Sequence, residues 1–503
     1  MFSSSLIVEK TNDWLYQNRL VLLSALFLVC LSLLRTAIHV DEARYLTVAW
    51  EMFANDEYLV PHLNGETYAH KPPLLFWVTN AMWSLTGVYL WSARLIPILF
   101  ILLTLLVLPR LYAALFHQEK SPPPPLIIQG FFLSNFVILG LSQLFMFDII
   151  MMFWVTMGWL IILQGKTQPA LLGLIIGLAI LTKGPVIFVY LIPVFILQGI
   201  LDPSRRTGRS TGYTLLAISI GSAIGLSWAL LAAYQGGEEY AQALLWKQSA
   251  NRLVSSPYHQ RPWWFYLVFL PAFIIPGCFI LRWRTVKSMT FWENSSVRLV
   301  GAWLLTVFLL FTLISCKQLQ YLVPLIPLIS ILMARAYQQE NIILNSTNFI
   351  GNDITGDRPL KVVLASSFIL FSIVIYPLNQ QLEKRLPLNG ISQSLQAFTN
   401  APLAFFHTKY HGELGFPTQR TKIDHLEEIK DLKEWFRQNP RGVAVLFDSA
   451  NFFPGFYHFN WFRPIPHGWD SMAELGQFYK DYTVIARFPG KNNDKIVVQR
   501  RVF

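Results

Sequence analysis

The chain has 503 residues, of which 53% are hydrophobic and only 14% are charged, a composition too apolar for an ordinary soluble protein. Its formal net charge of +11 comes from Lys and Arg dispersed through short loops, which is typical of lipid-facing loops and argues against a nucleic-acid partner. The three cysteines, Cys30, Cys278 and Cys316, lie in or beside apolar runs and form neither a disulfide framework nor a CxxC metal motif. We therefore expect a polytopic membrane protein.

Apolar runs long enough to cross a bilayer recur through most of the chain, since about 20 residues span roughly 30 Å of hydrocarbon. The first run lacks a small-x-small cleavage site, so we expect it to be retained as a span. Allowing for a missed or split span, the fold class is a polytopic α-helical membrane protein with about 11–13 transmembrane helices. The expected spans are 20–38, 92–116, 124–142, 146–164, 170–182, 186–201, 211–234, 263–281, 298–316, 321–337 and 361–377.

Loop charge predicts the orientation. The loops 202–209 and 282–287 are short and basic, which indicates the cytoplasmic side, and the acid-rich first loop 39–91 then falls on the extracytoplasmic side. With an odd number of spans, the tail 378–503 is extracytoplasmic too. On this topology Asp148, Lys183, the loop 235–262 and Lys317 also fall on the side of the first loop.

The tail differs in composition from the rest of the chain. Alternating apolar residues predict strands at 443–448 and 494–503, and the charged segment 424–439 predicts a helix. We expect two domains: a transmembrane domain at 1–377, whose first loop 39–91 carries the catalytic chemistry, and an extracytoplasmic soluble α/β domain at 378–503.

Three acids are candidates for catalysis. Asp41 and Glu42 directly follow the first span, where a carboxylate beside hydrocarbon is costly unless it has a partner or a function, and one of them is the natural general base. The alternative is that they end a helix and are solvated. Asp148 interrupts a long apolar run; it could mark only a hairpin turn, although Ser or Gly would do so at lower cost.

Several cations and polar groups are expected on the same face and suit a phosphate leaving group. Lys71 is followed by Pro72 and Pro73, which restrict the backbone around it. The alternative for each cation is snorkelling to lipid headgroups. His70 and His259 are candidate ligands for a divalent metal, but no dense spacing such as HExxH supports them, and no Walker A motif is present. The candidate substrate-binding residues are Lys71, Arg252, His259, Arg261, Lys317 and Tyr321.

Together these motifs resemble a known family. DEARY (41–45), VPHLNGETYAHKPPLLFW (60–77), SARL (92–95), Asp148, LTKGP (181–185), HQRPWWFY (259–266) and KQLQYLVPLIP (317–327) occur in order. They are similar to integral-membrane glycosyltransferases of the C-type fold, namely the aminoarabinose (lipid A) transferases, which are related to the protein O-mannosyltransferases. The resemblance covers roughly the first 340 residues. It implies inverting transfer of a sugar from a polyprenyl-phosphate donor on the extracytoplasmic face.

The resemblance also implies residue roles. Asp41 matches the first-loop acid and Asp148 the second acid, while Tyr68, Lys71, Arg261 and Tyr321 match contacts to the donor phosphate. Some relatives have Glu, linked to metal binding, where this chain has His70, and some relatives work without metal. A divalent metal is therefore a hypothesis, and no cofactor is required by this interpretation.

The sequence thus favours a polyprenyl-phosphate-sugar-dependent glycosyltransferase. The expected partners are the lipid-linked donor, a glycolipid, glycan or protein acceptor, and membrane lipids. The expected location is a bacterial inner membrane. The competing class is a lipid-linked sugar flippase, which would be expected to carry broken helices and polar residues near mid-membrane in two related halves. A scaffold that presents the tail would leave the first-loop chemistry unexplained.

Overall fold

The computed structural model describes residues 3–36, 38–119, 122–164, 168–201, 208–247, 261–281, 283–347, 358–385, 387–406, 410–427, 429–447, 482–488 and 495–500. The chain divides into two compact units. Unit 1 consists of Met1–Leu34 and Ala69–Ile373, and unit 2 consists of Arg35–Tyr68 and Val374–Phe503. The beginning of the first loop therefore folds with the tail.

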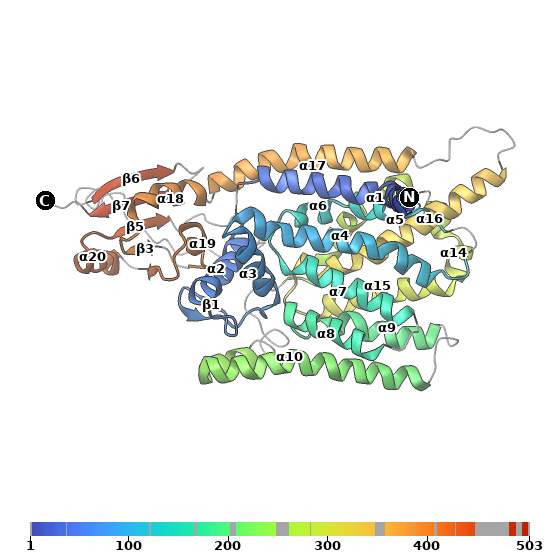
Figure 1. Ribbon diagram of the computed structural model, residues 1–503, viewed down its shortest axis with the longest axis horizontal. Helices are drawn as coiled ribbons and strands as arrows, with labels where there is room; N and C mark the ends of the chain where they lie inside the picture. Colours follow the sequence, from blue (N-terminus) through green and yellow to red (C-terminus); the bar gives the residue numbers. More distant parts are fainter. Residues whose placement is uncertain are drawn as a thin grey trace. The chain divides into compact units, whose positions relative to one another are not determined.

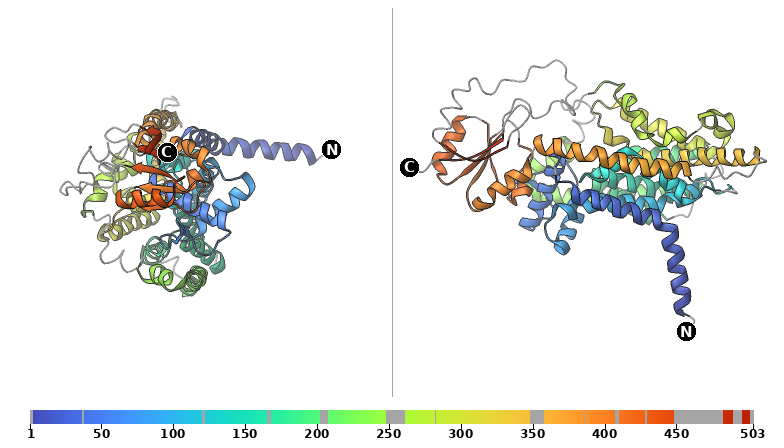
Figure 2. Two further views of the ribbon diagram at one scale, coloured as in Figure 1. Left: turned by 90° about the vertical axis from the view of Figure 1, so that its left-hand side faces the viewer. Right: turned by 90° about the horizontal axis from the view of Figure 1, so that it is seen from above.

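Unit 1 is helical (Figure 1). Figure 2 shows α1 running out beyond the other helices of this unit at its N-terminal end. The elements are α1 (Ser3–Leu34), α3 (Leu74–Thr86), α4 (Leu90–Leu115), α5 (Pro125–Leu133), α6 (Phe136–Ser142), α7 (Phe147–Leu163), α8 (Pro169–Lys183), α9 (Ile187–Leu201), α10 (Gly208–Gln242), η2 (Ala243–Lys247), α12 (Phe265–Phe269), η3 (Leu270–Phe273), η4 (Gly277–Ile280), α13 (Trp283–Lys287), α14 (Met289–Glu293), α15 (Ser295–Leu313), η5 (Leu319–Leu325), α16 (Ile326–Thr347) and α17 (Arg358–Arg385), whose C-terminal part belongs to unit 2.

The predicted spans correspond closely to these helices. Among the described residues, five helices are long and apolar enough to cross a membrane, and α5 with α6 passes as a pair bent by 71°. The span expected at 263–281 was wrong as a single helix: the chain there forms the short elements α12, η3 and η4. Pro271 and Pro276 explain the interruption, because each lacks the amide that a continuous helix needs. The helices make this an integral membrane protein.

The bend between α5 and α6 is set by Asn135. Its Oδ1 accepts the amides of Val137 and Ile138 at 2.9 and 3.3 Å and so caps α6, and its Nδ2 donates to the carbonyl of Phe273 at 2.8 Å. A buried cap of this kind satisfies amides that lipid could not.

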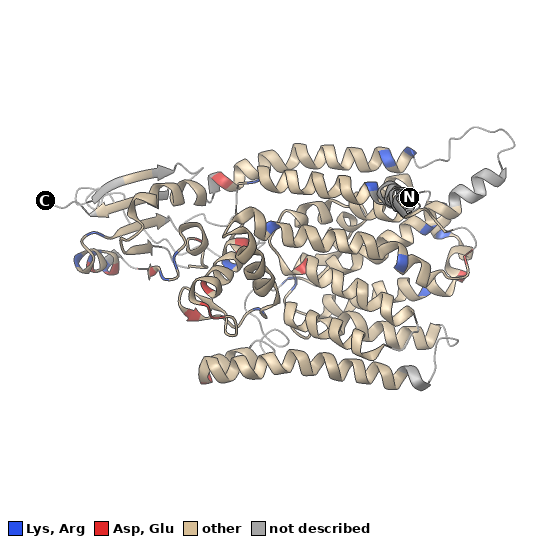
Figure 3. Ribbon diagram, viewed as in Figure 1, with Lys and Arg blue, Asp and Glu red and all other residues tan. Residues whose placement is uncertain are grey.

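Two GxxxG motifs bring α8 and α10 together. Gly173 and Gly177 on α8 face α10, where a Cβ on Gly173 would lie 2.7 Å from Ile220. Gly221 and Gly225 on α10 face α8 in return, and a Cβ on Gly225 would lie 2.3 Å from Ile180. Small residues allow this close backbone approach, which stabilises helix pairs in lipid. Figure 3 shows that charged residues gather mainly near the helix ends of this unit.

Unit 2 contains a two-stranded hairpin and a five-stranded sheet. The sheet order is β4-β3-β5-β7-β6; β3 is parallel to β4 and β5, whereas β7 is antiparallel to β5 and β6. The elements are α2 (Val40–Asn55), β1 (His62–Leu63), β2 (Glu66–Thr67), α18 (Leu388–Leu395), η6 (Gln396–Phe398), β3 (Leu403–Phe406), α19 (Gly415–Thr418), β4 (Asp424–Leu426), α20 (Ile429–Gln438), β5 (Val443–Phe447), β6 (Tyr482–Phe488) and β7 (Lys495–Arg500).

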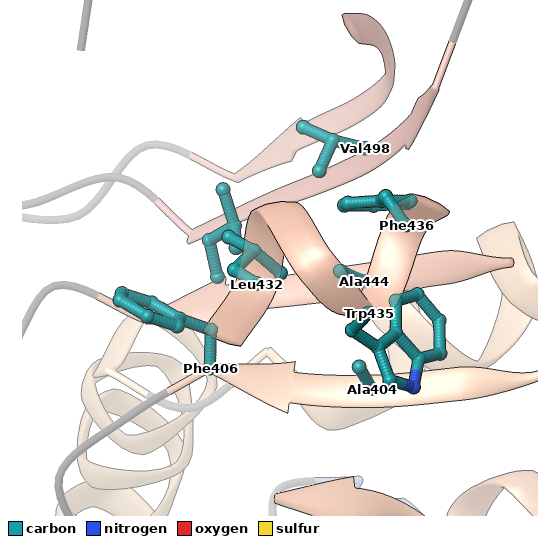
Figure 4. Packing of buried hydrophobic residues seen from close by; sticks show 8 residues of the cluster. Ala404, Phe406, Leu432, Trp435, Phe436, Ala444 and Val498 are labelled. Carbon is teal, nitrogen blue, oxygen red and sulfur yellow. The ribbon is translucent and has the colours of Figure 1, made fainter. Parts of the chain in front are cut away.

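The expected small α/β fold of the tail is confirmed, with one change. The strands predicted at 443–448 and 494–503 are β5 and β7, but the helix predicted at 424–439 begins only at Ile429, after the strand β4. The apolar face of α20 covers the sheet, where Trp435 and Phe436 pack against side chains of β3, β5 and β7 (Figure 4). The Nε1 of Trp435 donates to the carboxylate of Asp424 at 2.7 Å, so the buried indole keeps a polar partner.

Candidate active site

The start of α2 is built by a capping box. The His39 ring nitrogen Nδ1 accepts the amide of Asp41 at 3.2 Å, and the Glu42 carboxylate accepts the amide of His39 at 3.3 Å. Burial lowers the pKa of His39, which favours the neutral ring that this acceptor role requires. The carboxylates of Asp41 and Glu42 both lie in the first turn of α2, where the helix dipole favours negative charge.

The adjacent acids Asp41 and Glu42 have different surroundings. The side chain of Glu42 is fully buried and pairs with Arg35, Nη2 to Oε2, at 3.0 Å. The side chain of Asp41 is 21% exposed and lies 3.3 Å from Arg44. Glu42 is thus engaged by a buried ion pair and by the helix start, whereas Asp41 keeps contact with solvent.

The hairpin that follows α2 brings Tyr68 into the same neighbourhood. Its turn residues Asn64 and Gly65 have φ values of 59° and 80°, as a type I′ turn requires, and Asn-Gly is the favoured pair for that turn. The amide of Tyr68 donates to the carbonyl of Pro61 at 2.7 Å, and the phenol is 4% exposed. Asp41 and Tyr68 both interact electrostatically with Arg44.

Arg44 is a further residue of this region, and no role was predicted for it from the sequence. Burial would lower its pKa, but the charge of Asp41, the phenols of Tyr68 and Tyr45 and the charge of Glu413 raise the pKa overall. A guanidinium held among such groups stays charged and can contact a phosphate. The sequence spacing could have indicated that Arg44 lies beside Asp41, because residues at i and i+3 of a helix share a face.

Unit 1 contains a second group of charged residues, centred on Asp148. The Lys183 ammonium pairs with the Asp148 carboxylate, and both side chains are largely buried, with 9% and 5% of their area exposed. The same ammonium lies 4.7 Å from the centre of the Tyr321 ring. Two predicted site residues, Asp148 and Tyr321, are therefore brought together by Lys183, which the sequence analysis placed on the same face without naming it a partner.

Backbone contacts fix Tyr321 in this group. Its carbonyl accepts the hydroxyl of Tyr190 at 2.7 Å, and the carbonyl of Tyr190 accepts the Nε1 of Trp303 at 2.7 Å. These bonds connect η5 to α9 and α15. The Lys183 ammonium thus faces an aromatic ring held in place by buried hydrogen bonds.

Lys71 lies beside the residue that precedes Asp148. Its ammonium is 5.9 Å from the centre of the Phe147 ring, and that ring packs edge-on against Phe76 of α3. Pro73 is the N-cap of α3, so the two prolines join Lys71 directly to a helix start. His70 is exposed. Lys71 and Asp148 are therefore in the same part of unit 1.

Lys317 holds the backbone near Arg261. Only 5% of Lys317 is exposed, and its ammonium donates to the carbonyls of Arg261 at 3.2 Å and Ile314 at 2.7 Å. The amide of Arg261 donates to the carbonyl of Ser315 at 3.3 Å, while its guanidinium carbon lies 5.5 Å from the centre of the Phe265 ring. Burial lowers the pKa of Lys317. These contacts make Lys317 an anchor for the segment that carries Arg261.

Two predicted site residues, Arg252 and His259, lie outside the described residues. Within the described ranges, no three His, Cys, Asp or Glu side chains converge as a metal site would require. The expected metal pair joins His70, which is among the described residues, with His259, which is not. Metal binding by this pair therefore stays a prediction.

The chain is similar in sequence to known proteins. Residues 70–228 match the family described as dolichyl-phosphate-mannose-protein mannosyltransferase. The chain is 26% identical over 328 residues to the undecaprenyl phosphate-alpha-4-amino-4-deoxy-L-arabinose arabinosyl transferase of Pseudomonas aeruginosa, covering 62% of this chain and 58% of that protein. It is 27% identical over 315 residues to the protein of the same name from Edwardsiella ictaluri, covering 59% and 55%. The chain thus spans less than two thirds of the length of these curated relatives.

The fold comparison extends over almost the whole chain. The crystal structure of ArnT from Cupriavidus metallidurans bound to undecaprenyl phosphate matches with a TM-score of 0.71 and 18% identity, covering 96% of this chain and 98% of that one. Its apo structure matches with a TM-score of 0.70 and 16% identity, covering 97% and 98%. The chain therefore resembles the aminoarabinose transferases and protein mannosyltransferases in sequence and has the C-type fold of integral-membrane glycosyltransferases.

Proposed function

We propose that this protein is a glycosyltransferase that moves a sugar from a polyprenyl-phosphate donor to an extracytoplasmic acceptor, with inversion at the anomeric carbon. Supporting this proposal are the sequence similarity to undecaprenyl-phosphate-dependent arabinosyl transferases and the fold shared with ArnT. The donor in those relatives' names is an undecaprenyl-phosphate-linked aminopentose, which is the first donor to test. The acceptor class remains lipid A or another glycolipid, a glycan or a protein.

The observation that carries the proposal is the buried group of Asp148, Lys183 and Tyr321. Buried ion pairs cost desolvation energy, and in a membrane protein ionisable residues at such positions usually serve transport or catalysis. Here the pair joins the first turn of α7 to the last turn of α8, and Lys71 lies against the neighbouring Phe147. The ammonium of Lys71 beside this group suits a negatively charged leaving group.

The proposal assigns a role to each of these residues. Lys71, Arg261 and Tyr321 contact the donor phosphate, which leaves with the bonding electrons of the anomeric carbon–oxygen bond as the acceptor oxygen attacks. Asp41 accepts the acceptor's proton when that acceptor is a hydroxyl, and orients the acceptor when it is already an anionic phosphate. Its partly exposed carboxylate beside Arg44 suits either role.

Two predicted site residues receive structural roles in this proposal. Glu42 closes the capping box and neutralises Arg35, so it stabilises the start of α2 in place of acting as a catalytic acid. Lys317 positions the backbone of Arg261 through two carbonyl contacts in place of contacting substrate. Both residues therefore act through a neighbour.

A flippase would use the same lipid-linked sugar without breaking a bond. The described helices favour transfer, because their charged residues lie near the helix ends, whereas a transporter is expected to carry ionisable residues near mid-membrane in two related halves. We further propose the bacterial inner membrane as the location, with the first loop and tail on the extracytoplasmic side.

The decisive experiment uses the purified protein in lipid nanodiscs with undecaprenyl-phosphate-linked aminoarabinose and lipid A. Mass spectrometry should detect glycosylated lipid A with the wild type and about ten- to hundredfold less with the Lys71→Ala variant. A panel of other donors and acceptors, guided by mass spectrometry of envelope glycans from cells with and without the gene, then defines the substrates. Donor movement across liposomes without any glycosylated product would establish the flippase instead.

A further inference from the structure

Unit 2 contains a polar cavity that the proposed function does not use. Its volume is about 560 Å³, a size typical of sites for small ligands. The cavity lies where the end of α17 and the start of α18 meet the segment before α2. Its lining carries one carboxylate, two carboxamides and two hydroxyls; the lining residues are Thr36, Glu383, Asn389, Gly390, Ser392 and Gln393.

Hydrogen bonds hold the walls of this cavity together. The Nδ2 of Asn379 on α17 donates to the Thr36 hydroxyl at 3.3 Å, and the Nδ2 of Asn389 on α18 donates to the Thr36 carbonyl at 3.2 Å. Glu383 follows Asn379 by four residues on α17 and therefore lies on the same face of that helix. Thr36 thus joins the two helices whose side chains line the cavity.

The sequence of α18 explains its polar contribution to the lining. Leu388, Ile391 and Leu395 are buried, and their spacing of three and four residues puts them on one face of the helix. The other face is left to polar side chains, among them Asn389 and Gln393, which line the cavity. The helix therefore packs by its apolar face and presents amide groups to the cavity.

A series of hydrogen bonds connects the cavity to the helix that carries Asp41. The Ser392 hydroxyl of the lining donates to the carbonyl of Pro417. The amide of the neighbouring Phe416 donates to the Thr47 hydroxyl of α2 at 2.9 Å. One wall of the cavity is therefore fixed against α2.

A second contact fixes the tail against the first loop. The side chain of Asn64 donates from Nδ2 to the carbonyl of Ile423 and accepts the amide of Ile423 at Oδ1, both at 2.8 Å. Thr36 lies five residues before Asp41, so their Cα atoms are at most about 18 Å apart. A molecule bound in the cavity is therefore held near the residue proposed to act on the acceptor.

The charge of the lining selects the kind of ligand. The Glu383 Oε2 is buried, and no described group forms a hydrogen bond with it. No Lys, Arg or His is among the described lining residues. A phosphate would be repelled here, whereas an ammonium group would gain a charged hydrogen bond. Carboxamides and hydroxyls offer both donors and acceptors, as sugar hydroxyls require.

We propose that this cavity binds the carbohydrate part of the acceptor, through its hydroxyl groups and, in an amino sugar, through an ammonium that pairs with Glu383. Any phosphate on that acceptor stays outside the cavity. The site favours a glycan or glycolipid acceptor over a protein. This inference rests on the proposed function for its link to transfer, but sugar binding can be measured without turnover.

Ligand-observed NMR measures binding directly, with the full-length protein in nanodiscs that lack phosphatidylethanolamine. The probes are the glucosamine disaccharide, its N-acetylated form and ethanolamine. The wild type should bind both disaccharides, and Glu383→Gln should weaken binding of the glucosamine disaccharide about tenfold because a charged hydrogen bond is lost. Equal affinities of the two proteins for that disaccharide would overturn the proposal. Ethanolamine that competes as well as the disaccharide would identify a lipid-headgroup site and overturn it too.

Two further variants keep the test independent of Glu383. Glu434→Gln is the matched control, because Glu434 is an exposed carboxyl of α20 in the same unit, and it should bind as the wild type does. Gln393→Ala removes an exposed carboxamide of the lining without risk to the fold. It should weaken binding of both disaccharides about two- to tenfold, and unchanged binding would contradict the proposal.

Melting temperatures distinguish a binding carboxylate from a structural one. Glu383→Gln preserves volume, and no described hydrogen-bond partner of Oε2 is lost, so the variant should melt no lower than the wild type. The glucosamine disaccharide should raise the melting temperature of the wild type more than that of the variant. A variant that melts several degrees lower and still binds the disaccharide as the wild type does would assign Glu383 to folding alone.

Transfer assays with lipid A connect the cavity to the reaction. Glu383→Gln and Gln393→Ala should each raise the KM for lipid A about two- to tenfold, while kcat and the KM for the donor stay within about twofold. An effect on the KM for the donor alone would assign the cavity to the donor and overturn the proposal. If the wild type transfers no sugar from any polyprenyl donor, the proposed function fails, and the NMR experiment still decides whether the cavity binds sugar.

Discussion

Lys183 and Asp148 form a buried ion pair between the last turn of α8 and the first turn of α7. Each charge lies at the helix end whose dipole favours it, cation at the C-terminus and anion at the N-terminus. The pair therefore stabilises the junction of two antiparallel helices and keeps two charges where water has little access. Its contributions to folding and to transfer can be separated by mutation.

Breaking this pair from one side should destabilise the protein. Asp148→Asn or Lys183→Met leaves a buried charge unpaired, which should cost about 3–5 kcal/mol of unfolding free energy and abolish transfer. The double variant should recover most of the stability while remaining inactive. Thermal unfolding in detergent and product assays measure the two effects. A double variant with wild-type turnover would show that the pair is structural only.

The adjacent acids of α2 should respond differently to neutralisation. Asp41→Asn should abolish transfer to a hydroxyl acceptor with little change in melting temperature, because Asp41 is partly exposed and its charge, not its volume, is lost. Glu42→Gln should lower stability by about 3–5 kcal/mol, since it leaves Arg35 buried without its anion. The opposite pattern, an inactive stable Glu42 variant and an active Asp41 variant, would exchange the two roles.

Lys71→Ala should impair use of the donor. Loss of a charged contact to phosphate in a partly shielded position should reduce donor affinity or rate about ten- to hundredfold. Lys71→Arg should recover part of the activity. Initial rates against donor concentration provide the measurement. A lysine that only snorkels to headgroups would leave both variants with the kinetics of the wild type.

The stability of unit 2 should fall as pH rises. Glu51 accepts the amides of Asn64 and Gly65, yet burial raises its pKa to about 7. The folded protein therefore binds a proton more tightly than the unfolded chain between about pH 4.5 and 7, and up to ~3 kcal/mol of stability is lost across that range. Melting temperatures at pH 5.5 and 8 test this, with Glu51→Gln expected to have a flatter slope. If the melting temperature depends on pH equally in the wild type and in Glu51→Gln, a group other than Glu51 causes the effect.

The topology makes a separate prediction. Reporter fusions after Gly208, beside a basic loop, and after Arg441, in the tail, should report opposite sides of the membrane, cytoplasmic and extracytoplasmic respectively. Protease protection in sealed vesicles provides an independent measurement. Agreement of both reporters on one side would require a revised span count.

Local composition was sufficient to predict most helices, because long apolar runs such as Leu90–Leu115 have one stable structure in lipid. It was insufficient where prolines divide such a run, as at 263–281, and for α3, which is too short to be recognised as a span. The acids Asp41 and Asp148 could be selected from sequence because charge beside hydrocarbon is conspicuous. The pairing of Asp148 with Lys183 could not be predicted, since these residues are 35 positions apart and lie on different helices.

The pairing of Asn64 with Ile423 also has a consequence for biogenesis. The two residues are 359 positions apart, so at about 5–20 residues per second a ribosome needs about 20–70 s to make the second after the first. Throughout that interval the hairpin has no partner in the tail, so the first loop completes its contacts only after α17 has been synthesised. These contacts are thereby postponed until synthesis is nearly finished, and chains truncated before the tail should lack them.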